Sequence, residues 1–106
     1  MATKQIDPLP STVKVGRKLY NVHTVDKMHK RGDMGRVVYD SKHIEIALRS
    51  SKTERPFNNN EVHETFWHEL THAILHDMGR DTLNRDERFV EEFSTRLHKA
   101  IKSARF

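Results

Sequence analysis

The chain has 106 residues, a net charge of +4 and a mean hydropathy of −0.81. This length predicts a single domain over residues 1–106, with residues 1–11 as a loose N-terminal lead-in that contains Pro8 and Pro10. The sequence has neither an apolar run long enough for a membrane span nor the apolar region of a signal peptide, so we expect a cytoplasmic protein. It has no cysteine, which excludes disulfides and thiolate metal ligands.

The N-terminal half predicts a small antiparallel β-sheet. Residues 12–15, 19–25, 36–39 and 43–48 read as strands, and Gly16-Arg17-Lys18 and Asp40-Ser41-Lys42 read as the turns within two pairs of them. Ile44, Ile46 and Leu48 alternate with other residues, which indicates a sheet with one buried face. The polar segments 28–35 and 50–60 are expected to be mobile loops that border a cleft.

A helix is predicted over about residues 60–79. Residues 58–60 are three asparagines that can cap its N-terminus, Glu61 and Glu64 place negative charge in its first turn, and Gly79 suits its C-terminal end. Apolar residues recur at three- and four-residue steps and predict one buried face: Val62, Phe66, Leu70, Ala73 and Ile74. Trp67 and Leu75 lie beside this face, so we expect a second layer on the other side of the helix.

Residues 68–72 of this helix read His-Glu-Leu-Thr-His, which fits the H-E-x-x-H pattern of zinc peptidases. Positions four apart lie on one face of a helix, so His68 and His72 can bind one ion. Glu69 lies one position further round, where it can flank a metal-activated water as general base. The pattern therefore predicts a zinc ion bound by two histidines.

A catalytic zinc site needs a third protein ligand. His76 continues the row of histidines, but a residue eight positions after His68 stands about 12 Å along the helix axis, too far to share the ion. We therefore expect His76 to line the edge of the site or to pack.

A second helix is predicted over about residues 84–104, with Asn84 and Glu87 spaced like a capping box. Its apolar residues are expected to pack on the core: Phe89, Val90, Phe93, Leu97, Ala100, Ile101 and Ala104. Glu87, Glu91 and Glu92 are the acids near its start. Glu87 is the favoured third ligand and Glu91 the alternative, because Glu92 falls on the opposite flank.

This arrangement resembles a minimal gluzincin, the thermolysin-like class of zinc peptidases. The resemblance implies that His68, His72 and Glu87 bind zinc, that Glu69 is the general base, and that Glu91 orients a ligand histidine. It also implies that the strand at residues 43–49 is an edge that binds an extended peptide or protein substrate. The chain further resembles small phage and prophage zinc peptidase-like proteins over about residues 14–97. It departs from thermolysin in a shorter interval between His72 and Glu87, and no downstream histidine or tyrosine matches the auxiliary transition-state residues.

The alternative function is a catalytically weak or inactive zinc-binding protein of phage origin that acts through protein or nucleic-acid binding. The basic composition raises the nucleic-acid version of this hypothesis. Its basic residues form two groups along the chain: Lys27, Lys30, Arg31 and Arg36, and then Lys99, Lys102 and Arg105. We favour solubility and helix capping as their role, because no motif of a known nucleic-acid-binding module accompanies them.

Overall fold

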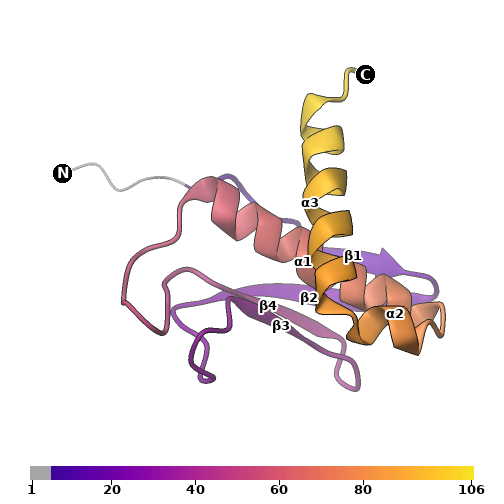
Figure 1. The fold of residues 1–106 in the computed structure, drawn as a ribbon, viewed down its shortest axis with the longest axis horizontal. Helices are drawn as coiled ribbons and strands as arrows, with labels where there is room; N and C mark the ends of the chain where they lie inside the picture. The colour runs from indigo at the N-terminus through magenta and orange to yellow at the C-terminus, as the bar shows by residue number, and fades with distance from the viewer. Residues whose placement is uncertain (1–5) are drawn as a thin grey trace.

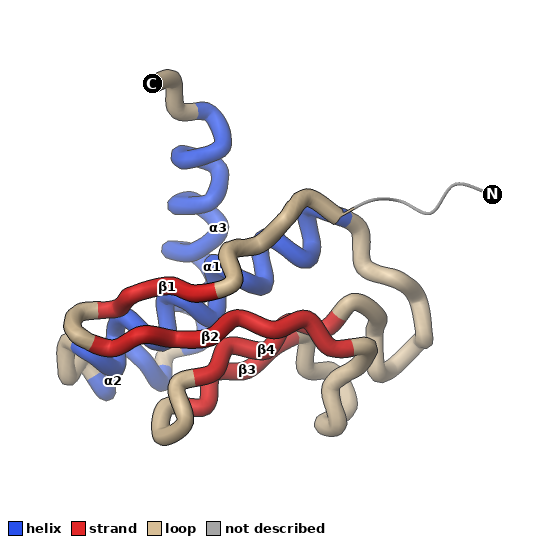
Figure 2. Tube along the Cα trace, turned by 180° about the vertical axis from the view of Figure 1, so that it is seen from behind, coloured by secondary structure: helices blue, strands red, loops and turns tan. Residues whose placement is uncertain are grey.

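The computed structural model describes residues 6–106 and has the α+β fold expected from the sequence. Four strands come first: β1 (Thr12–Val15), β2 (Lys18–Val25), β3 (Gly35–Val38) and β4 (His43–Ala47). Three helices follow: α1 (Asn59–Asp77), α2 (Asp81–Arg85) and α3 (Glu87–Ser103). One face of the sheet packs on α1, and no helix of the described chain covers the other face (Figures 1 and 2).

The sheet is mixed, so the prediction of an antiparallel sheet is wrong. Its strand order is β1-β2-β4-β3, with antiparallel pairing inside each hairpin and parallel pairing between β2 and β4. In β4, Ile44, Ile46 and Ala47 are fully buried. The most apolar strand thus takes an interior place, where both of its edges are hydrogen-bonded, and β3 becomes the edge. The expectation that residues 43–49 form an edge strand is therefore also wrong.

The core lies between the inner face of the sheet and α1. Its buried apolar side chains include Tyr20, Ile44 and Ile46 from the sheet, and Val62, Phe66, Leu70 and Ala73 from α1. Ile74 was predicted to belong to the buried face of α1, but it is 38% exposed. Leu75 is buried in its place, because α2 and α3 pack on the far side of the helix. The expected second layer on α1 is thus present.

Local signals place α1 as predicted. Asn58 is the N-cap, and its side chain and that of Glu61 form a reciprocal capping box. The helix ends at Asp77 with Met78 as its C-cap. Gly79 follows with a φ of +70°, which is accessible to glycine, and its N–H donates to His76 O at 3.0 Å. These two ends fix the register of the helix, and with it the direction in which its histidines point.

The second predicted helix is divided in the structure. Asp86 is the N-cap of α3 and accepts a hydrogen bond from Phe89 N, so the capping role predicted for Asn84 is wrong. Asn84 lies in the separate short helix α2. The predicted apolar face of α3 is buried only in part, because Phe93 and Ile101 remain 48% and 46% exposed. The C-terminal end of α3 extends away from the sheet and α1 (Figure 1).

Residues 6–11 form neither strand nor helix, as predicted for the N-terminal lead-in, while residues 1–5 of that prediction lie outside the described residues. This segment nevertheless contacts α1: Asp7 N donates to Asn59 Oδ1 at 2.7 Å, and Asp7 O lies 3.0 Å from His63 Nε2. No helix in the described part of the chain is long and apolar enough to span a membrane.

Candidate metal centre

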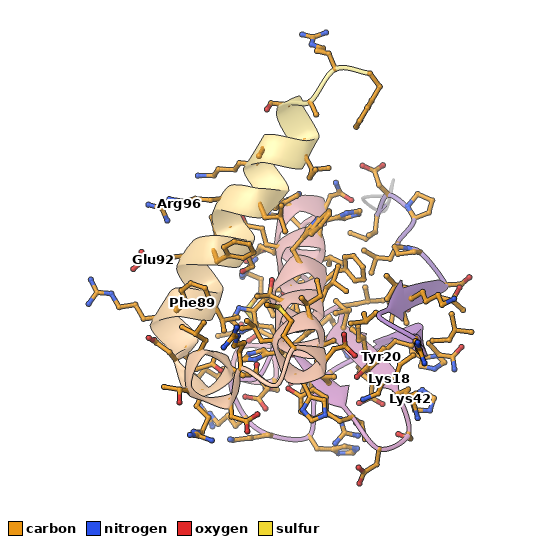
Figure 3. The ribbon with its side chains drawn as sticks, turned by 90° about the vertical axis from the view of Figure 1, so that its right-hand side faces the viewer. Lys18, Tyr20, Lys42, Phe89, Glu92 and Arg96 are labelled. Carbon is orange, nitrogen blue, oxygen red and sulfur yellow. The ribbon has the colours of Figure 1, made fainter. Side chains whose placement is uncertain are left out.

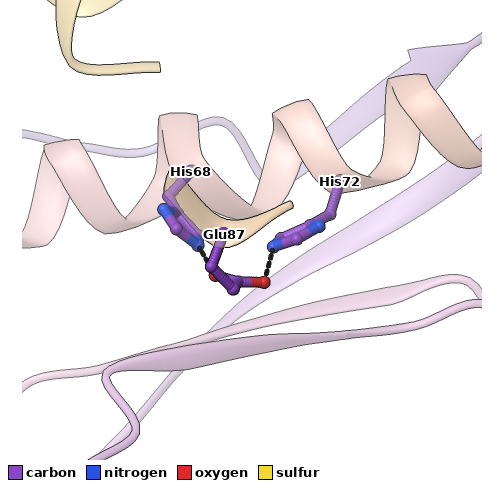
Figure 4. A group of neighbouring side chains, drawn as sticks. All are labelled: His68, His72 and Glu87. Atoms are coloured by element: carbon purple, nitrogen blue, oxygen red, sulfur yellow. Dashed lines mark hydrogen bonds and ion pairs between the residues drawn. The ribbon is translucent and has the colours of Figure 1, made fainter. Parts of the chain in front are cut away.

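His68 and His72 lie one turn apart on the face of α1 that turns away from the sheet core. Their ring centroids are 5.0 Å apart, and their side chains are 19% and 13% exposed. The short helix α2 turns the chain back, so that the N-terminus of α3 returns to this face. Glu87, the first residue of α3, is thereby placed opposite both imidazoles (Figure 4).

The Glu87 carboxylate lies between the two histidines. Its Oε2 is 3.2 Å from His68 Nε2, and its Oε1 is 3.0 Å from His72 Nε2. One ligand atom from each of the three residues lies within 4.8 Å of the others. Ligands about 2.0–2.1 Å from a tetrahedral ion are about 3.4 Å apart, so this group could hold a metal ion with little movement.

The other ring nitrogens determine which tautomer each histidine adopts. His68 Nδ1 lies 2.9 Å from Glu91 Oε2, and His72 Nδ1 lies 2.6 Å from Asn84 Oδ1. A carboxylate or amide oxygen accepts hydrogen bonds, so each Nδ1 donates, and a neutral ring in that tautomer offers the lone pair of Nε2 to a metal ion. In that tautomer a cation between the two Nε2 atoms and the Glu87 carboxylate would satisfy all three groups.

The remaining candidates have separate places. Glu91, the alternative third ligand, bonds Nδ1 of His68, which is the position that the gluzincin resemblance implied for it. Glu92 pairs with Arg88 on the side of α3 away from α1 (Figure 3). His76 is stacked on Tyr39 with ring centroids 3.9 Å apart, so it packs at the edge of the site.

Glu69 projects toward the sheet from the same turn of α1. Glu69 is only 8% exposed, and it lines the cleft next to His68 and His72. Burial raises the pKa of Glu69 to about 8, and the negative charges of Glu87 and Asp33 act in the same direction. A cation beside Glu87 would offset that neighbouring charge and favour the ionised form of Glu69.

An open cleft of about 760 Å³ contains the site. One wall is the segment from Lys30 through β3 to Tyr39, and the other is formed by α1 together with Glu87 and Glu91 of α3. The predicted loop at residues 28–35 therefore borders the cleft. Within the described lining, the predicted loop at residues 50–60 contributes no residue. The edge strand β3 lies beside the candidate ligands.

Sequence reasoning missed two residues of the site. Asn84 joins His72 to Tyr39, because its Nδ2 donates to the Tyr39 hydroxyl at 3.1 Å while its Oδ1 accepts from His72. The sequence predicted Asn84 to cap a helix, and it predicted Tyr39 only as part of a strand. Neither residue belongs to the H-E-x-x-H motif or to the helix that carries it, so no local sequence pattern assigns them to the site.

The first predicted basic group is partly neutralised by neighbouring acids. Lys27 Nζ lies 2.8 Å from Glu54 Oε1, and Arg36 is paired with Glu45. These contacts occupy two of its four basic side chains and reduce the positive charge that the group presents to a polyanion.

No protein-family model, curated protein or solved structure matches the chain.

Proposed function

We propose that this protein is a zinc-dependent peptidase that hydrolyses peptide bonds with Glu69 as the general base. The observation that carries the proposal is the convergence of His68 Nε2, His72 Nε2 and the Glu87 carboxylate beside a buried Glu69 in an open cleft. The gluzincin resemblance assigns the same roles to the same four residues. The geometry and the motif therefore favour one activity independently of each other.

Zinc is the metal that best suits this donor set. Two imidazole nitrogens and one carboxylate, in a chain without cysteine, make up a common set of protein ligands for catalytic zinc. Three protein ligands would leave room for a water on a four-coordinate ion. When bound there, zinc would supply the acidity that activates a water and the positive charge that polarises the substrate carbonyl.

Glu69 would then move the proton. Its carboxylate accepts a proton from the attacking water and passes it to the amine that leaves when the peptide bond breaks. The burial of Glu69 suits both steps, because a carboxylate with a raised pKa holds the proton between them. Glu91 and Asn84 hold the two imidazoles through Nδ1 and keep each Nε2 lone pair available.

The substrate would bind as an extended peptide along β3. This strand has β4 as its neighbour on one side, and its other edge faces the cleft. An extended peptide can add to such an edge through backbone hydrogen bonds, which would place one of its carbonyl groups opposite Glu69.

The variant Glu69→Gln tests the proposal. We expect it to keep stoichiometric zinc, measured by elemental analysis of the purified protein, and to lose at least about 100-fold in the rate of peptide cleavage. The matched control is Glu92→Gln, because Glu92 bonds Arg88 away from the cleft and should leave both quantities unchanged. Wild-type protein that binds no zinc, or a Glu69→Gln protein that cleaves as fast as wild type, would refute it.

A broad peptide library separates the peptidase from a zinc-binding protein that acts only through its partners. A peptidase cleaves some members, and the Glu69→Gln protein cleaves none of these. Zinc binding without any cleavage in the library would favour the binding protein. A salt-sensitive affinity for DNA, measured at several salt concentrations, would favour its nucleic-acid version.

A further inference from the structure

Tyr39 is connected to the candidate metal centre through two hydrogen bonds. Its hydroxyl oxygen accepts from Asn84 Nδ2 at 3.1 Å, and Asn84 Oδ1 accepts from His72 Nδ1 at 2.6 Å. Tyr39 directly follows β3 and lines the same cleft as Glu69 and Glu87. One asparagine therefore fixes both a candidate ligand and this hydroxyl.

The ring of Tyr39 also has a partner. It stacks on His76 of α1 with ring centroids 3.9 Å apart and an interplanar angle of 15°. The side chain is thus fixed at the ring by His76 and at the hydroxyl by Asn84. Such preorganisation is what a group needs if it is to stabilise a charge without reorganising first.

The hydroxyl is placed to donate a hydrogen bond. Its oxygen already accepts from Asn84, and its single hydrogen has no partner among the hydrogen bonds of the described residues. Burial raises the pKa of Tyr39 above its ordinary value of 10, and the charges of Glu69 and Glu87 act in the same direction, against the smaller lowering effect of the Asn84 hydrogen bond. Tyr39 therefore stays protonated at neutral pH and presents a neutral donor among the carboxylates Glu69, Glu87 and Glu91.

We propose that Tyr39 is a catalytic residue whose hydroxyl donates a hydrogen bond to the carbonyl oxygen of the scissile peptide bond as that oxygen gains negative charge. This inference rests on the proposed peptidase function. The carbonyl carbon becomes tetrahedral when water adds to it, and the electron pair of the C=O bond moves onto the oxygen. A donor aimed at that oxygen strengthens its contact in the transition state, so its loss lowers kcat more than it raises KM.

The variant Tyr39→Phe removes only the hydroxyl and leaves a ring that can stack on His76. We expect kcat to fall by about 100-fold or more, as when one donor to a developing oxyanion is removed, with KM within about threefold of wild type. Zinc affinity should remain that of wild type. The control is Tyr20→Phe, because Tyr20 is 1% exposed in the core and lies outside the cleft lining, so its kcat should not change.

A second measurement does not depend on turnover. A phosphinic peptide, which carries a tetrahedral centre with charged oxygens, should bind zinc-loaded Tyr39→Phe more weakly than zinc-loaded wild type by about the factor lost in kcat. An uncleaved substrate peptide bound to Glu69→Gln should lose little affinity when Tyr39→Phe is added. Equal weakening of both ligands would assign Tyr39 to general substrate binding and overturn the proposal.

A purely positioning role gives a different result. Asn84→Ala removes the partner of His72 Nδ1 and should lower zinc affinity by about 10- to 100-fold. If Tyr39→Phe lowers zinc affinity in the same way, Tyr39 acts through Asn84 and the proposal is overturned, as it is if kcat is unchanged. Wild-type protein that cleaves no peptide refutes the peptidase function itself. Cleavage by wild type with an undiminished rate in Tyr39→Phe refutes the role of Tyr39 alone.

Discussion

Gly35 of β3 lies so close to Glu69 of α1 that a Cβ atom on Gly35 would stand 3.2 Å from Glu69 Cγ. The same atom would come within 2.8 Å of Thr65 Cγ2 and of the Glu45 carbonyl oxygen. The missing side chain thus allows the edge strand to approach the helix where Glu69 enters the cleft. The place of β3 and the orientation of the candidate general base are therefore linked.

We predict that Gly35→Ala lowers peptide cleavage at least about tenfold while zinc content stays at the wild-type level. The new methyl group meets Thr65 and Glu69, whereas none of the candidate ligands is among the nearest atoms to it. Forcing a methyl group into a packed site costs about 1–3 kcal/mol, which urea unfolding can measure.

The control for this prediction is Gly79→Ala at the end of α1. Gly79 has a φ of +70°, and an added Cβ would meet nothing within 4 Å, so the change strains the backbone and crowds no neighbour. It should cost about 1–3 kcal/mol of stability and leave the cleavage rate per folded molecule unchanged. Equal losses of activity in the two alanine variants would contradict the link between Gly35 and Glu69.

Metal binding should stabilise the fold, because the ligands come from two helices that meet only in the folded chain. Zinc at 100 times its dissociation constant should add about 2.7 kcal/mol, seen as a raised melting temperature that a chelator reverses. Glu87→Gln should abolish most of this gain. Glu91→Gln should weaken zinc by about 10- to 100-fold only, since Glu91 contacts Nδ1 of His68. A larger loss of zinc affinity with Glu91→Gln than with Glu87→Gln would show that Glu91, and not Glu87, is the third ligand.

The capping box of α1 offers a stability test that leaves the metal centre intact. Asn58 Oδ1 accepts from Glu61 N at 2.8 Å, and Glu61 Oε1 accepts from Asn58 N at 2.9 Å. We predict that Asn58→Ala costs about 1 kcal/mol in thermal or urea unfolding. Asn60→Ala, at an exposed position inside the first turn, should change stability by less than about 0.5 kcal/mol. Equal effects would show that the cap contributes nothing of its own.

The helices and strands were predictable because their signals are local. The alternation of Ile44 and Ile46, the cap at Asn58 and the glycine at position 79 each act within a few residues. The strand order was not predictable in this way. It depends on which strand gains most from burial on both edges, and β4 takes that place by pairing with β2 at long range.

The same distinction explains the site. His68, Glu69 and His72 share one helix, so the helical period alone brings them to one region. Glu87 could be predicted as a ligand because it is one of the acids near the start of the next helix. Asn84 and Tyr39 depend on how α2 folds back and where β3 ends, and no spacing in the sequence encodes those contacts. The exposure of apolar residues on α3 was not predictable for a similar reason. Apolar periodicity does not indicate how far a helix extends beyond the elements on which it packs.

His98 is a buried titratable residue at the contact between α3 and α1. Its residue surface is 7% exposed, and its Nδ1 is buried without a hydrogen-bond partner among the described residues. The ring lies 6.2 Å from that of Trp67 and 6.4 Å from that of His63, measured between centroids. Burial lowers the pKa of His98, and the positive charge of Lys102 acts in the same direction, against the attraction of Glu64 at 3.9 Å.

We predict that this histidine weakens the fold under mildly acidic conditions. The folded protein holds His98 neutral, whereas the unfolded chain takes up a proton at a pKa of about 6.5, so stability is full above that value and falls as the pH drops below it. Glu69, with its raised pKa, changes stability in the opposite direction over this range, but equally in wild type and in a His98 variant. From pH 7 to pH 5 the free energy of unfolding of wild type, measured with urea, should therefore fall relative to that of His98→Phe, which keeps a ring beside Trp67 but cannot titrate. His29→Gln, at an exposed position, should change with pH as wild type does. If wild type and His98→Phe change by the same amount between these two pH values, His98 is not the titrating group.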